Sequence, residues 1–355
     1  MRAEAMVALG RLEDRPVASR RELTTLLNVA GEEERALLAS ADRVRARTVG
    51  DSVHLRALLD FSNHCRRNCR YCGLRRANSD LPRYRMSPDE IIAAARRAAN
   101  IGYRTIVLQS GEDPWYTAEM LAELIAAIKA EHDVAVTLSV GERPKADYRL
   151  LGEAGADRFL LRIETSSPEL YATLHPDSDW RQRLSCLESL RHLGYQVGSG
   201  VMIGLPGQSV EMLADDLLFL QSLELDMIGV GPFLPHPATP LAGASGGEFG
   251  LARRFLALLR LLCPSALIPA TTALAALDPR GWELGLGAGA DVLMPDITPG
   301  RYRRYYDLYP GKVRLADDPA ETRRQVEALV AGLGRRVAQD HGHSRRREPA
   351  GTRHG

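Results

Sequence analysis

The sequence predicts an α/β protein folded as a complete (βα)8 barrel of the TIM type, with an N-terminal helical extension and a disordered C-terminal tail. Eight short apolar runs of strand character recur along the chain, and amphipathic stretches with helical spacing separate them. Polar residues follow these runs, where a barrel gathers its active-site loops. With 355 residues and 45% hydrophobic content, the chain can bury such a core.

The order of elements follows from the spacing of apolar residues. Strands are expected at 53–63, 104–109, 134–140, 157–164, 195–204, 226–233, 266–272 and 291–296. The clearest helices are expected at 87–101, 117–131, 181–193, 209–223 and 251–263. Two Gly-Ala-Asp turns, in "EAGADRF" and "GAGADVL", stand between a helix and a strand, where a helix-ending glycine is expected. They support the phase of the repeat.

The two ends of the chain differ from the barrel in composition. Residues 1–50 are polar and helical, with "GEEERALLASADRVRART" followed by a Gly-Asp stop at 50 and 51, which predicts an N-terminal helical cap. We expect the barrel at 51–318 and a C-terminal helix at 319–338. The remaining 339–355 is polar and rich in charge, which predicts a disordered tail.

The charge balance argues against several classes of partner. Lysine and arginine number 46 against 45 aspartate and glutamate, so the net charge of +1 gives no general attraction to nucleic acid or anionic membranes. No apolar run reaches the length of a membrane span, and the first residues are too acidic for a signal peptide. We therefore expect a cytoplasmic protein.

Three of the five cysteines lie in "CRRNCRYC", directly after the first expected strand and therefore at the catalytic mouth of the barrel. An odd cysteine count without an export signal favours a metal site over disulfides. Zinc would require a fourth ligand, and Cys186 and Cys263 fall in helical patterns typical of core thiols. His64, beside Cys65, is the alternative fourth ligand.

A [4Fe-4S] cluster offers a different interpretation of three cysteines. Cys65, Cys69 and Cys72 would leave one iron without a protein ligand, and that iron can bind the amino and carboxylate groups of S-adenosylmethionine (SAM). This CxxxCxxC motif, with Tyr71 before its third cysteine, resembles the signature of radical SAM enzymes. In those enzymes the reduced cluster cleaves SAM into methionine and a 5′-deoxyadenosyl radical. The resemblance implies one [4Fe-4S] cluster and SAM as cofactors.

The same resemblance implies a SAM site at the barrel mouth. Tyr71 would lie near the adenine, Glu164 at the end of the fourth strand can hold the ribose diol, and Arg183 can pair with the methionine carboxylate. The block "SGEDP" resembles the site for the SAM amine, with Ser110, Gly111 and Glu112. Each has a structural alternative: loop packing for Tyr71, a solvated helix face for Arg183 and ordinary turn chemistry for the Gly-Glu pair.

Several blocks narrow the resemblance to the HydE family, the radical SAM maturases of [FeFe]-hydrogenase. They run from about residue 55 to 312 and read "NCRYCGLRRAN", "YRMSPDEI", "TIVLQSGEDP", "AGADRFLLRIET", "IGLPGQ", "GPFLPHPATPL", "IPATTA", "VLMPDITP" and "YDLYPGK". This implies radical chemistry in assembly of the hydrogenase H-cluster, on a precursor containing iron, carbon monoxide, cyanide and cysteine. Implied partners are other hydrogenase maturases and an electron donor such as flavodoxin or ferredoxin.

An inner cavity would hold this small anionic substrate. The candidates are the arginine and hydroxyl side chains expected to point inward, namely Thr137, Ser139, Arg162, Thr271, Thr272 and Tyr306. Their alternative is to fill the barrel interior with hydroxyls bonded internally. His236, between prolines, is as well explained as a turn residue and stays outside the catalytic set.

Three rival functions remain open. Methylornithine synthase and biotin synthase resemble this chain in the cysteine loop and barrel layout, although biotin synthase would require further cysteines inside the barrel. A non-catalytic iron–sulfur or zinc protein is the third. Some HydE proteins have a second cysteine cluster after the "YPGK" block, whereas this chain has none there, so we expect a single cluster.

Overall fold

The centre of the molecule is a six-stranded parallel sheet with the order β2-β3-β4-β5-β6-β8. The structure is a computed structural model that describes residues 2–312 and 315–344. The six strands are β2 (Ala57–Ser62), β3 (Thr105–Ser110), β4 (Ala135–Ser139), β5 (Arg158–Leu160), β6 (Gln196–Ser199) and β8 (Met227–Ile228). Neighbouring strands are parallel because a helix or loop crossover returns the chain to the same end each time.

Two smaller parallel sheets adjoin the central one. The first has the order β10-β1-β11, from β1 (Ser52–Leu55), β10 (Val292–Leu293) and β11 (Arg336–Val337). The second pairs β7 (Met202–Ile203) with β9 (Gly231–Pro232). Isolated parallel bridges join Met227 to Leu267, Pro269 to Val292, and Leu58 to Asp296. Hydrogen-bonded contacts therefore run from β8 through residues 267–269 to β10 and back to β2.

The expected strand at 266–272 is wrong as a regular strand. Pro269 has no backbone N–H for a ladder, and helix α11 (Thr272–Leu277) begins three residues later, so only isolated bridges form. The expected strand at 53–63 is divided at Arg56, and those at 195–204 and 226–233 are each broken into two pieces. A Cβ on Gly200 would come within 1.8 Å of the carbonyl oxygen of Gly229, so these two glycines bring the backbones unusually close where the strands break.

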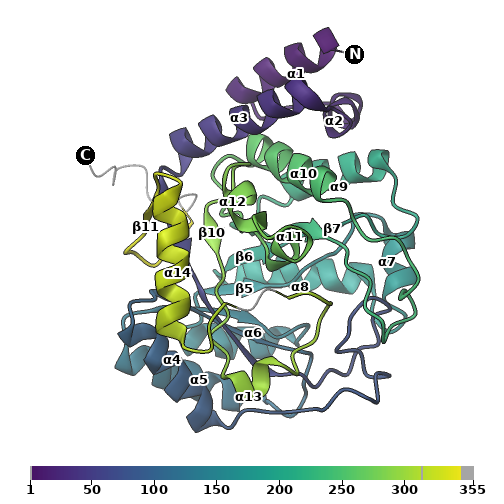
Figure 1. Ribbon diagram of the computed structural model, residues 1–355. Coiled ribbons are helices and arrows are strands. Elements are labelled where there is room, and N and C mark those ends of the chain that lie inside the picture. Colours follow the sequence, from purple (N-terminus) through teal and green to yellow (C-terminus); the bar gives the residue numbers. More distant parts are fainter. Residues whose placement is uncertain (1, 313–314, 345–355) are drawn as a thin grey trace.

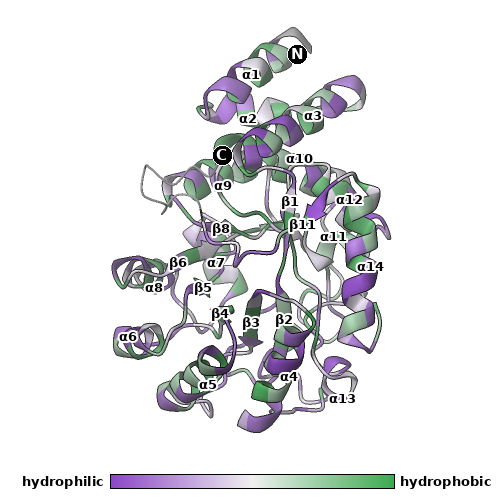
Figure 2. Cartoon of the chain, turned by 90° about the vertical axis from the view of Figure 1, so that its left-hand side faces the viewer, coloured by the Kyte–Doolittle hydropathy of each residue, from purple (hydrophilic) through white to green (hydrophobic). Residues whose placement is uncertain are grey.

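Helices surround the strands, as Figure 2 shows for α4, α5, α6 and α8. The larger outer helices are α4 (Pro88–Asn100), α5 (Ala118–Glu131), α6 (Lys145–Glu153), α8 (Trp180–His192), α9 (Val210–Ser222) and α10 (Phe249–Leu262). All except α6 match an expected helix within two residues. Side chains cap four of them at the N-terminus, and Ser87 on α4 completes a capping box with Glu90.

The helices that the sequence did not predict are mostly short. They are α6, α7 (Pro168–Leu174), α11, α12 (Gly281–Leu286) and α13 (Gly300–Arg303). Helices α6, α11, α12 and α13 have no side-chain N-cap, and all except α6 span seven residues or fewer, so neither a cap nor a long apolar period marks most of them in the sequence.

Residues 2–48 form three helices that stand beyond α9 and α10 in both views (Figures 1 and 2). They are α1 (Arg2–Asp14), α2 (Arg20–Leu27) and α3 (Gly31–Thr48). Helix α2 packs on α9, and α3 packs on α10. Leu23, Leu27, Leu37 and Ala41 are fully buried there, so apolar burial fixes these helices to the barrel.

The C-terminal segment closes the amino-terminal end of the strands. Helix α14 (Pro319–Gly332) is followed by β11 and then by residues 339–344, which were expected to be disordered but instead pack against the strands. The guanidinium of Arg158, fully buried, donates to the carbonyl oxygen of His341 at 2.6 Å, and Arg56 donates to that of Gly342 at 3.3 Å. These buried cations explain the order, because each needs an acceptor. The rest of the expected tail, 345–355, lies outside the described residues.

No helix in residues 2–312 and 315–344 combines the length and apolar composition needed to cross a bilayer.

Candidate active site

The three clustered cysteines lie in the irregular segment that leads from the carboxyl end of β2 to α4. All three are free thiols of intermediate exposure. The backbone N–H of Glu112, in the loop after β3, donates to Sγ of Cys65 at 3.4 Å. Arg83 ties the segment together, since its guanidinium donates to four carbonyl oxygens within it, including those of Asn63 and Leu74. The cysteine loop is therefore a fixed structure at the barrel mouth.

The surroundings of all three thiols oppose their ionisation. Burial, with added repulsion from Cys65, raises the pKa of Cys72 to about 12. Burial also raises the pKa of Cys69, with added repulsion from Cys72 and Cys65. Buried thiols of this kind become thiolates only beside a strongly positive group, so the donor set fits an iron–sulfur cluster.

A single zinc ion has less support from the geometry. Among residues 2–312 and 315–344, no three histidine, cysteine or acidic side chains surround a position for one metal ion. His64, the alternative fourth ligand, lies among other charges: burial lowers the pKa of its imidazole, and Arg85, Asp113 and Arg83 act on it.

A cavity of ≈ 340 Å³ opens beside the cysteine loop, at the carboxyl ends of the strands. Nine of the expected site residues line it, from the cluster, SAM and substrate sets: Tyr71, Cys72, Ser110, Ser139, Arg162, Glu164, Thr271, Thr272 and Tyr306. The structure thus brings together four residues of the cluster and SAM sets and five of the six substrate candidates. Thr137 does not line the cavity; its hydroxyl is buried without a hydrogen-bond partner.

Glu164 has an unusual backbone for its residue type. Its φ of 67° is in the left-handed region, which residues with a Cβ rarely adopt. Its N–H donates to Gly200 O and its carbonyl oxygen accepts from Met202 N, so the bridge to the next strand holds this conformation. Arg162 donates to its carboxylate at 3.1 Å. Strain of this kind is retained where a side chain must point in one direction, here into the cavity.

Gly111, Glu112 and Arg183 do not line the cavity. A Cβ on Gly111 would meet His64 O at 2.2 Å and the Cβ of Cys65 at 2.8 Å, so this glycine allows the loop after β3 to touch the cysteine loop. Glu112 and Arg183 belong instead to an ion-pair network, which we call the mouth network, behind the cavity wall.

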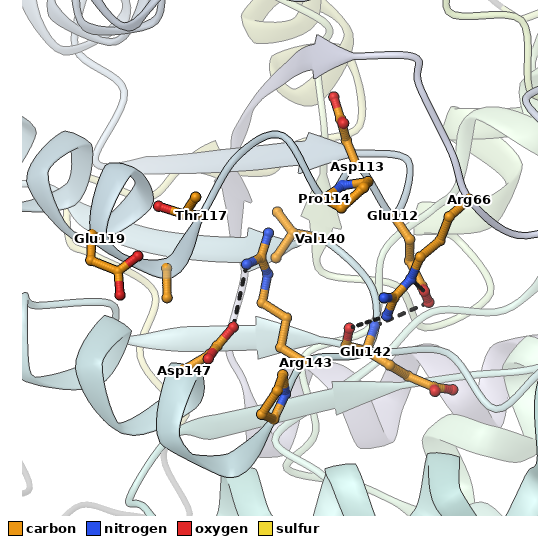
Figure 3. A pocket seen from close by; sticks show the side chains of 12 residues that line it. Arg66, Glu112, Asp113, Pro114, Thr117, Glu119, Val140, Glu142, Arg143 and Asp147 are labelled. Atoms are coloured by element: carbon orange, nitrogen blue, oxygen red, sulfur yellow. Dashed lines mark hydrogen bonds and ion pairs between the residues drawn. The ribbon is translucent and has the colours of Figure 1, made fainter.

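The mouth network joins two carboxylates to three guanidiniums. Glu112 accepts from Arg67 at 2.5 Å and from Arg66 at 3.1 Å, and Glu142 accepts from Arg67 at 2.7 Å and from Arg183 at 2.6 Å. Figure 3 shows Arg66 reaching from the cysteine loop toward both Glu112 and Glu142. Because Arg66 and Arg67 follow Cys65 in sequence, the network fixes the cysteine loop relative to the strands β3 and β4.

Arg183 is the deepest cation of the network. Its side chain is 10% exposed and lies over the ring of Tyr171, with 5.9 Å to the centroid. Burial lowers the pKa of Arg183, but Tyr171, Glu142 and Glu112 outweigh this effect and the pKa is raised. The guanidinium therefore stays charged although it is buried.

His175 was not predicted from the sequence as a site residue. Its Nδ1 lies 3.0 Å from the carbonyl oxygen of Tyr171, and its Nε2 lies 2.9 Å from the hydroxyl of Tyr71. Burial lowers the pKa of His175 to about 3, aided by Arg183, so the ring is neutral. A carbonyl oxygen can only accept, so Nδ1 carries the proton and Nε2 accepts from Tyr71. The "LHP" triplet is the sequence feature that could have pointed to this histidine.

A buried lysine between two aspartates forms another part of the cavity wall that the sequence analysis missed. Nζ of Lys312 lies 2.6 Å from Asp60 and 3.0 Å from Asp296, and Gln109 donates to the other oxygen of Asp60 at 2.9 Å. Lys312, Gln109 and Tyr309 line the cavity. Burial raises the pKa of Asp60 to about 6. The "YPGK" block contains Lys312, but the sequence does not show where that lysine lies in the fold.

A second pocket, of ≈ 290 Å³, lies between the segments that follow β3 and β4, and Arg66 of the cysteine loop also lines it (Figure 3). Arg66 and Arg143 line it together with acidic groups, among them Glu112 and Asp147. No cysteine is among its lining residues, and Arg143 and Asp147 approach each other at 3.5 Å. The thiol chemistry therefore belongs to the inner cavity.

His236 lies outside the cavity, as the sequence analysis expected of a turn residue. Its Nδ1 accepts from Ala238 N, and its Nε2 lies 2.9 Å from Asp307. A Cβ on Gly73 would meet His236 at 2.7 Å. The histidine thus supports the residue that follows Cys72.

The sequence has relatives that match this site and fold. Residues 59–220 match the model of the radical SAM superfamily. The [FeFe] hydrogenase maturase subunit HydE of Thermotoga maritima is 49% identical over 311 residues, which cover 88% of this chain and 89% of that protein. The chain belongs to the HydE family. It is a radical SAM enzyme, and its cofactors are a [4Fe-4S] cluster and SAM.

More distant relatives share the fold of this HydE-family chain. The 3-methylornithine synthase of Methanosarcina acetivorans is 31% identical over 315 residues, 88% of this chain and 87% of that protein. The crystal structure of methylornithine synthase (PylB) superposes with a TM-score of 0.83 at 25% identity, covering 93% of this chain and 97% of that one. The α/β fold is therefore that of the TIM-type radical SAM proteins.

Proposed function

We propose that this protein cleaves SAM reductively and acts in assembly of the [FeFe]-hydrogenase H-cluster, on a precursor containing iron, carbon monoxide, cyanide and cysteine. The observation that carries the proposal is the 49% identity, over 88% of the chain, to a HydE maturase. Partners proposed with this function are other hydrogenase maturases and a flavodoxin or ferredoxin as electron donor. We place the reaction in the cytoplasm, without nucleic-acid or membrane partners.

Different residues would bind the cluster and SAM. Cys65, Cys69 and Cys72 hold the cluster, which together with SAM supplies the 5′-deoxyadenosyl radical when bound. Six residues bind and orient SAM: Tyr71, Ser110, Gly111, Glu112, Glu164 and Arg183. Among these, Tyr71, Ser110 and Glu164 line the cavity, whereas Gly111, Glu112 and Arg183 act from the wall behind it.

The inner part of the cavity binds the substrate. The groups that would contact a small complex there are Arg162 and Lys312, each already paired with a carboxylate, and the hydroxyls of Ser139, Thr271 and Thr272. Tyr306 is buried at the same wall. Thr137 supports the wall from below rather than touching the substrate. The polar groups are few and the remaining lining is apolar, as in most small-molecule sites.

The proposed architecture is a complete (βα)8 barrel. The parallel bridges from Met227 to Leu267, from Pro269 to Val292 and from Leu58 to Asp296 support closure between β8 and β2. In a closed barrel the inward residues pack in layers, which agrees with a polar layer of Arg56 and Arg158 at one end and the cavity at the other.

The test is an anaerobic reaction of reconstituted enzyme, reductant and SAM with a synthetic iron complex bearing carbon monoxide, cyanide and cysteine. We expect 5′-deoxyadenosine, or an adenosylated product, to form at a rate that depends on the complex. A second arm supplies the same enzyme with lysine. Turnover with lysine and none with the iron complex would overturn the assignment.

A methylornithine-synthase-like activity is the second candidate. The identity of 31% over 88% of the chain and the TM-score of 0.83 support it. The lysine arm decides between the two. A biotin-synthase-like reaction has weaker support, because Cys186 and Cys263 are buried core thiols and neither is among the cavity-lining residues.

A further inference from the structure

We infer that the outer face of the cysteine loop is the docking surface for an acidic one-electron carrier protein. The face consists of Arg66, Arg70, Arg75 and Arg76, and we call it the arginine face. Residues 61–79 contain five arginines and no aspartate or glutamate. Such a run is usually a solvated surface, so the inference depends on whether other parts of the fold neutralise it.

Other loops neutralise this charge only in part. The carboxylates that pair with the cysteine loop are Glu112, Glu142 and Asp177. Glu112 and Glu142 are shared among Arg66, Arg67 and Arg183, and Arg76 is 3.8 Å from Asp177. Among the described residues, no carboxylate pairs with Arg70 or Arg75. The five arginines of the loop, together with Arg183, thus face these three carboxylates. Three positive charges remain without a carboxylate.

Both the paired and the unpaired arginines of this face are at least partly exposed, since Arg70 and Arg75 are half-buried. The side chain of Arg76 is 63% exposed and that of Arg66 is 51% exposed, whereas Arg67, which has two carboxylate partners, is 17% exposed. Arg76 donates to the carbonyl oxygen of Arg66, so these two exposed guanidiniums belong to one patch.

The patch is also adjacent to the cluster ligands. Arg66 follows Cys65, and Arg70 follows Cys69, so their Cα atoms lie about 3.8 Å from those of the ligands. The thiols themselves are only partly exposed, and Cys72 lines the inner cavity. A protein donor therefore comes nearest to the cluster on the outside of this loop.

Charge complementarity identifies the partner. The whole chain has a net charge of +1, so a surplus of three positive charges in and around the cysteine loop leaves the rest of the molecule slightly negative. The resulting field turns an acidic protein toward the arginine face and repels it elsewhere. In the encounter the carrier loses one electron and the cluster gains it, with no bond made or broken. The inference rests on the electron donor proposed above and not on the substrate.

The experiment compares two reductants of the same holoenzyme: a reduced flavodoxin of net negative charge, and dithionite, a small anion that needs no docking surface. Arg76→Glu reverses one charge of the arginine face. Arg324→Glu on α14 is the matched control, since its side chain is also 63% exposed and ion-paired. Cluster reduction is followed by stopped-flow absorbance, and flavodoxin binding is measured separately by biolayer interferometry.

We expect Arg76→Glu to slow reduction by flavodoxin about tenfold and to weaken binding similarly at low salt. The Arg324→Glu variant should retain the original rate, and dithionite should reduce all three proteins equally. Arg76→Gln should show a smaller loss, which separates lost charge from damage to the loop. Equal effects of Arg76→Glu and Arg324→Glu, or a flavodoxin rate insensitive to salt, would overturn the inference. Neither result would alter the substrate assay, so the two proposals fail separately.

Discussion

The hydroxyl of Tyr71 donates a hydrogen bond to Nε2 of His175 across 2.9 Å, and the two rings meet edge to face at 81°. Tyr71 stands immediately before Cys72, whereas His175 ends the short helix α7 more than a hundred residues later. His175 is in turn stacked on Tyr171, with ring centroids 4.0 Å apart. The aromatic wall of the cavity is therefore held by a neutral histidine.

Removing this hydrogen bond should loosen SAM binding. We expect Tyr71→Phe and His175→Phe each to weaken SAM affinity about fivefold, as for one neutral hydrogen bond. The double variant should be no worse than either single one, because both remove the same bond. His175→Gln, which keeps an acceptor, should recover part of the loss. Isothermal titration with the holoenzyme measures these affinities; fully additive losses would show that the two residues act separately.

The cysteines provide a direct test of the cluster site. Alanine at Cys65, Cys69 or Cys72 should abolish both the bound iron and the formation of 5′-deoxyadenosine, because a cluster held by two thiolates is not retained. Cys186→Ala is the control, since that thiol is buried beside Gln182 on α8. It should leave both readouts intact. Iron analysis and EPR spectra of reconstituted protein distinguish the cases, and the opposite pattern would refute the assignment.

Gly141 creates the space that Glu112 occupies. Its φ is 75°, and a Cβ there would lie 1.9 Å from Cγ of Glu112. We expect Gly141→Ala to lower the free energy of unfolding by about 2 kcal/mol more than Gly194→Ala. Gly194 also has a positive φ, of 89°, but no atom lies within 4 Å of its Cβ position, so it isolates backbone strain. Urea unfolding provides the comparison; equal losses would mean that Glu112 moves freely aside.

Asp60 should make stability depend on pH. Burial raises its pKa from 3.8 to about 6, so the folded state keeps a proton that the unfolded state releases. The free energy of unfolding contributed by this group therefore falls as pH rises from about 4 through 6. Asp60→Asn removes this titration, so its free energy of unfolding relative to that of the original protein should rise between pH 4 and 7. The expectation would be contradicted if the free energies of unfolding of the two proteins, measured with urea, changed equally with pH.

The segment 339–344 should contribute to stability as well. A chain shortened after Ala338 loses the carbonyl acceptors of Arg158 and Arg56, whereas a chain shortened after Ser344 keeps them. We expect the free energy of unfolding of the first chain to be about 2 kcal/mol lower than that of the second. Thermal unfolding of both chains tests this. An equal midpoint would show that water replaces the lost acceptors without cost.

The alternation of apolar runs and amphipathic helices was sufficient to predict the overall fold, because periodicity records which face is buried. It failed at 266–272, where Pro269 prevents regular pairing, and in short helices such as α7, which tertiary contacts stabilise. The tail was misjudged for a similar reason. Its order comes from the buried Arg158, which no local pattern in 339–344 reveals.

The site was predictable where motif spacing defined it and not where distant segments meet. The cysteines and Glu164 end or follow strands, so their positions at the mouth came from topology. Lys312 and Asp60 are 252 residues apart, and their pairing depends on the tertiary fold. The position of Glu112 behind the cavity wall was not predicted either, because the sequence does not show that the side chains of Arg66 and Arg67 point toward Glu112.

The closure of the barrel floor by residues 339–344 has a kinetic consequence. Because residues 339–344 cover the amino-terminal end of the strands, a cavity entered only from the opposite end would be loaded past the place where SAM is proposed to lie. Whatever occupies the inner cavity must then arrive before SAM and depart only after SAM or its fragments have left. Turnover would accordingly follow a compulsory order, with excess SAM trapping the empty enzyme. Release of product, rather than the radical step alone, would then limit the rate of turnover.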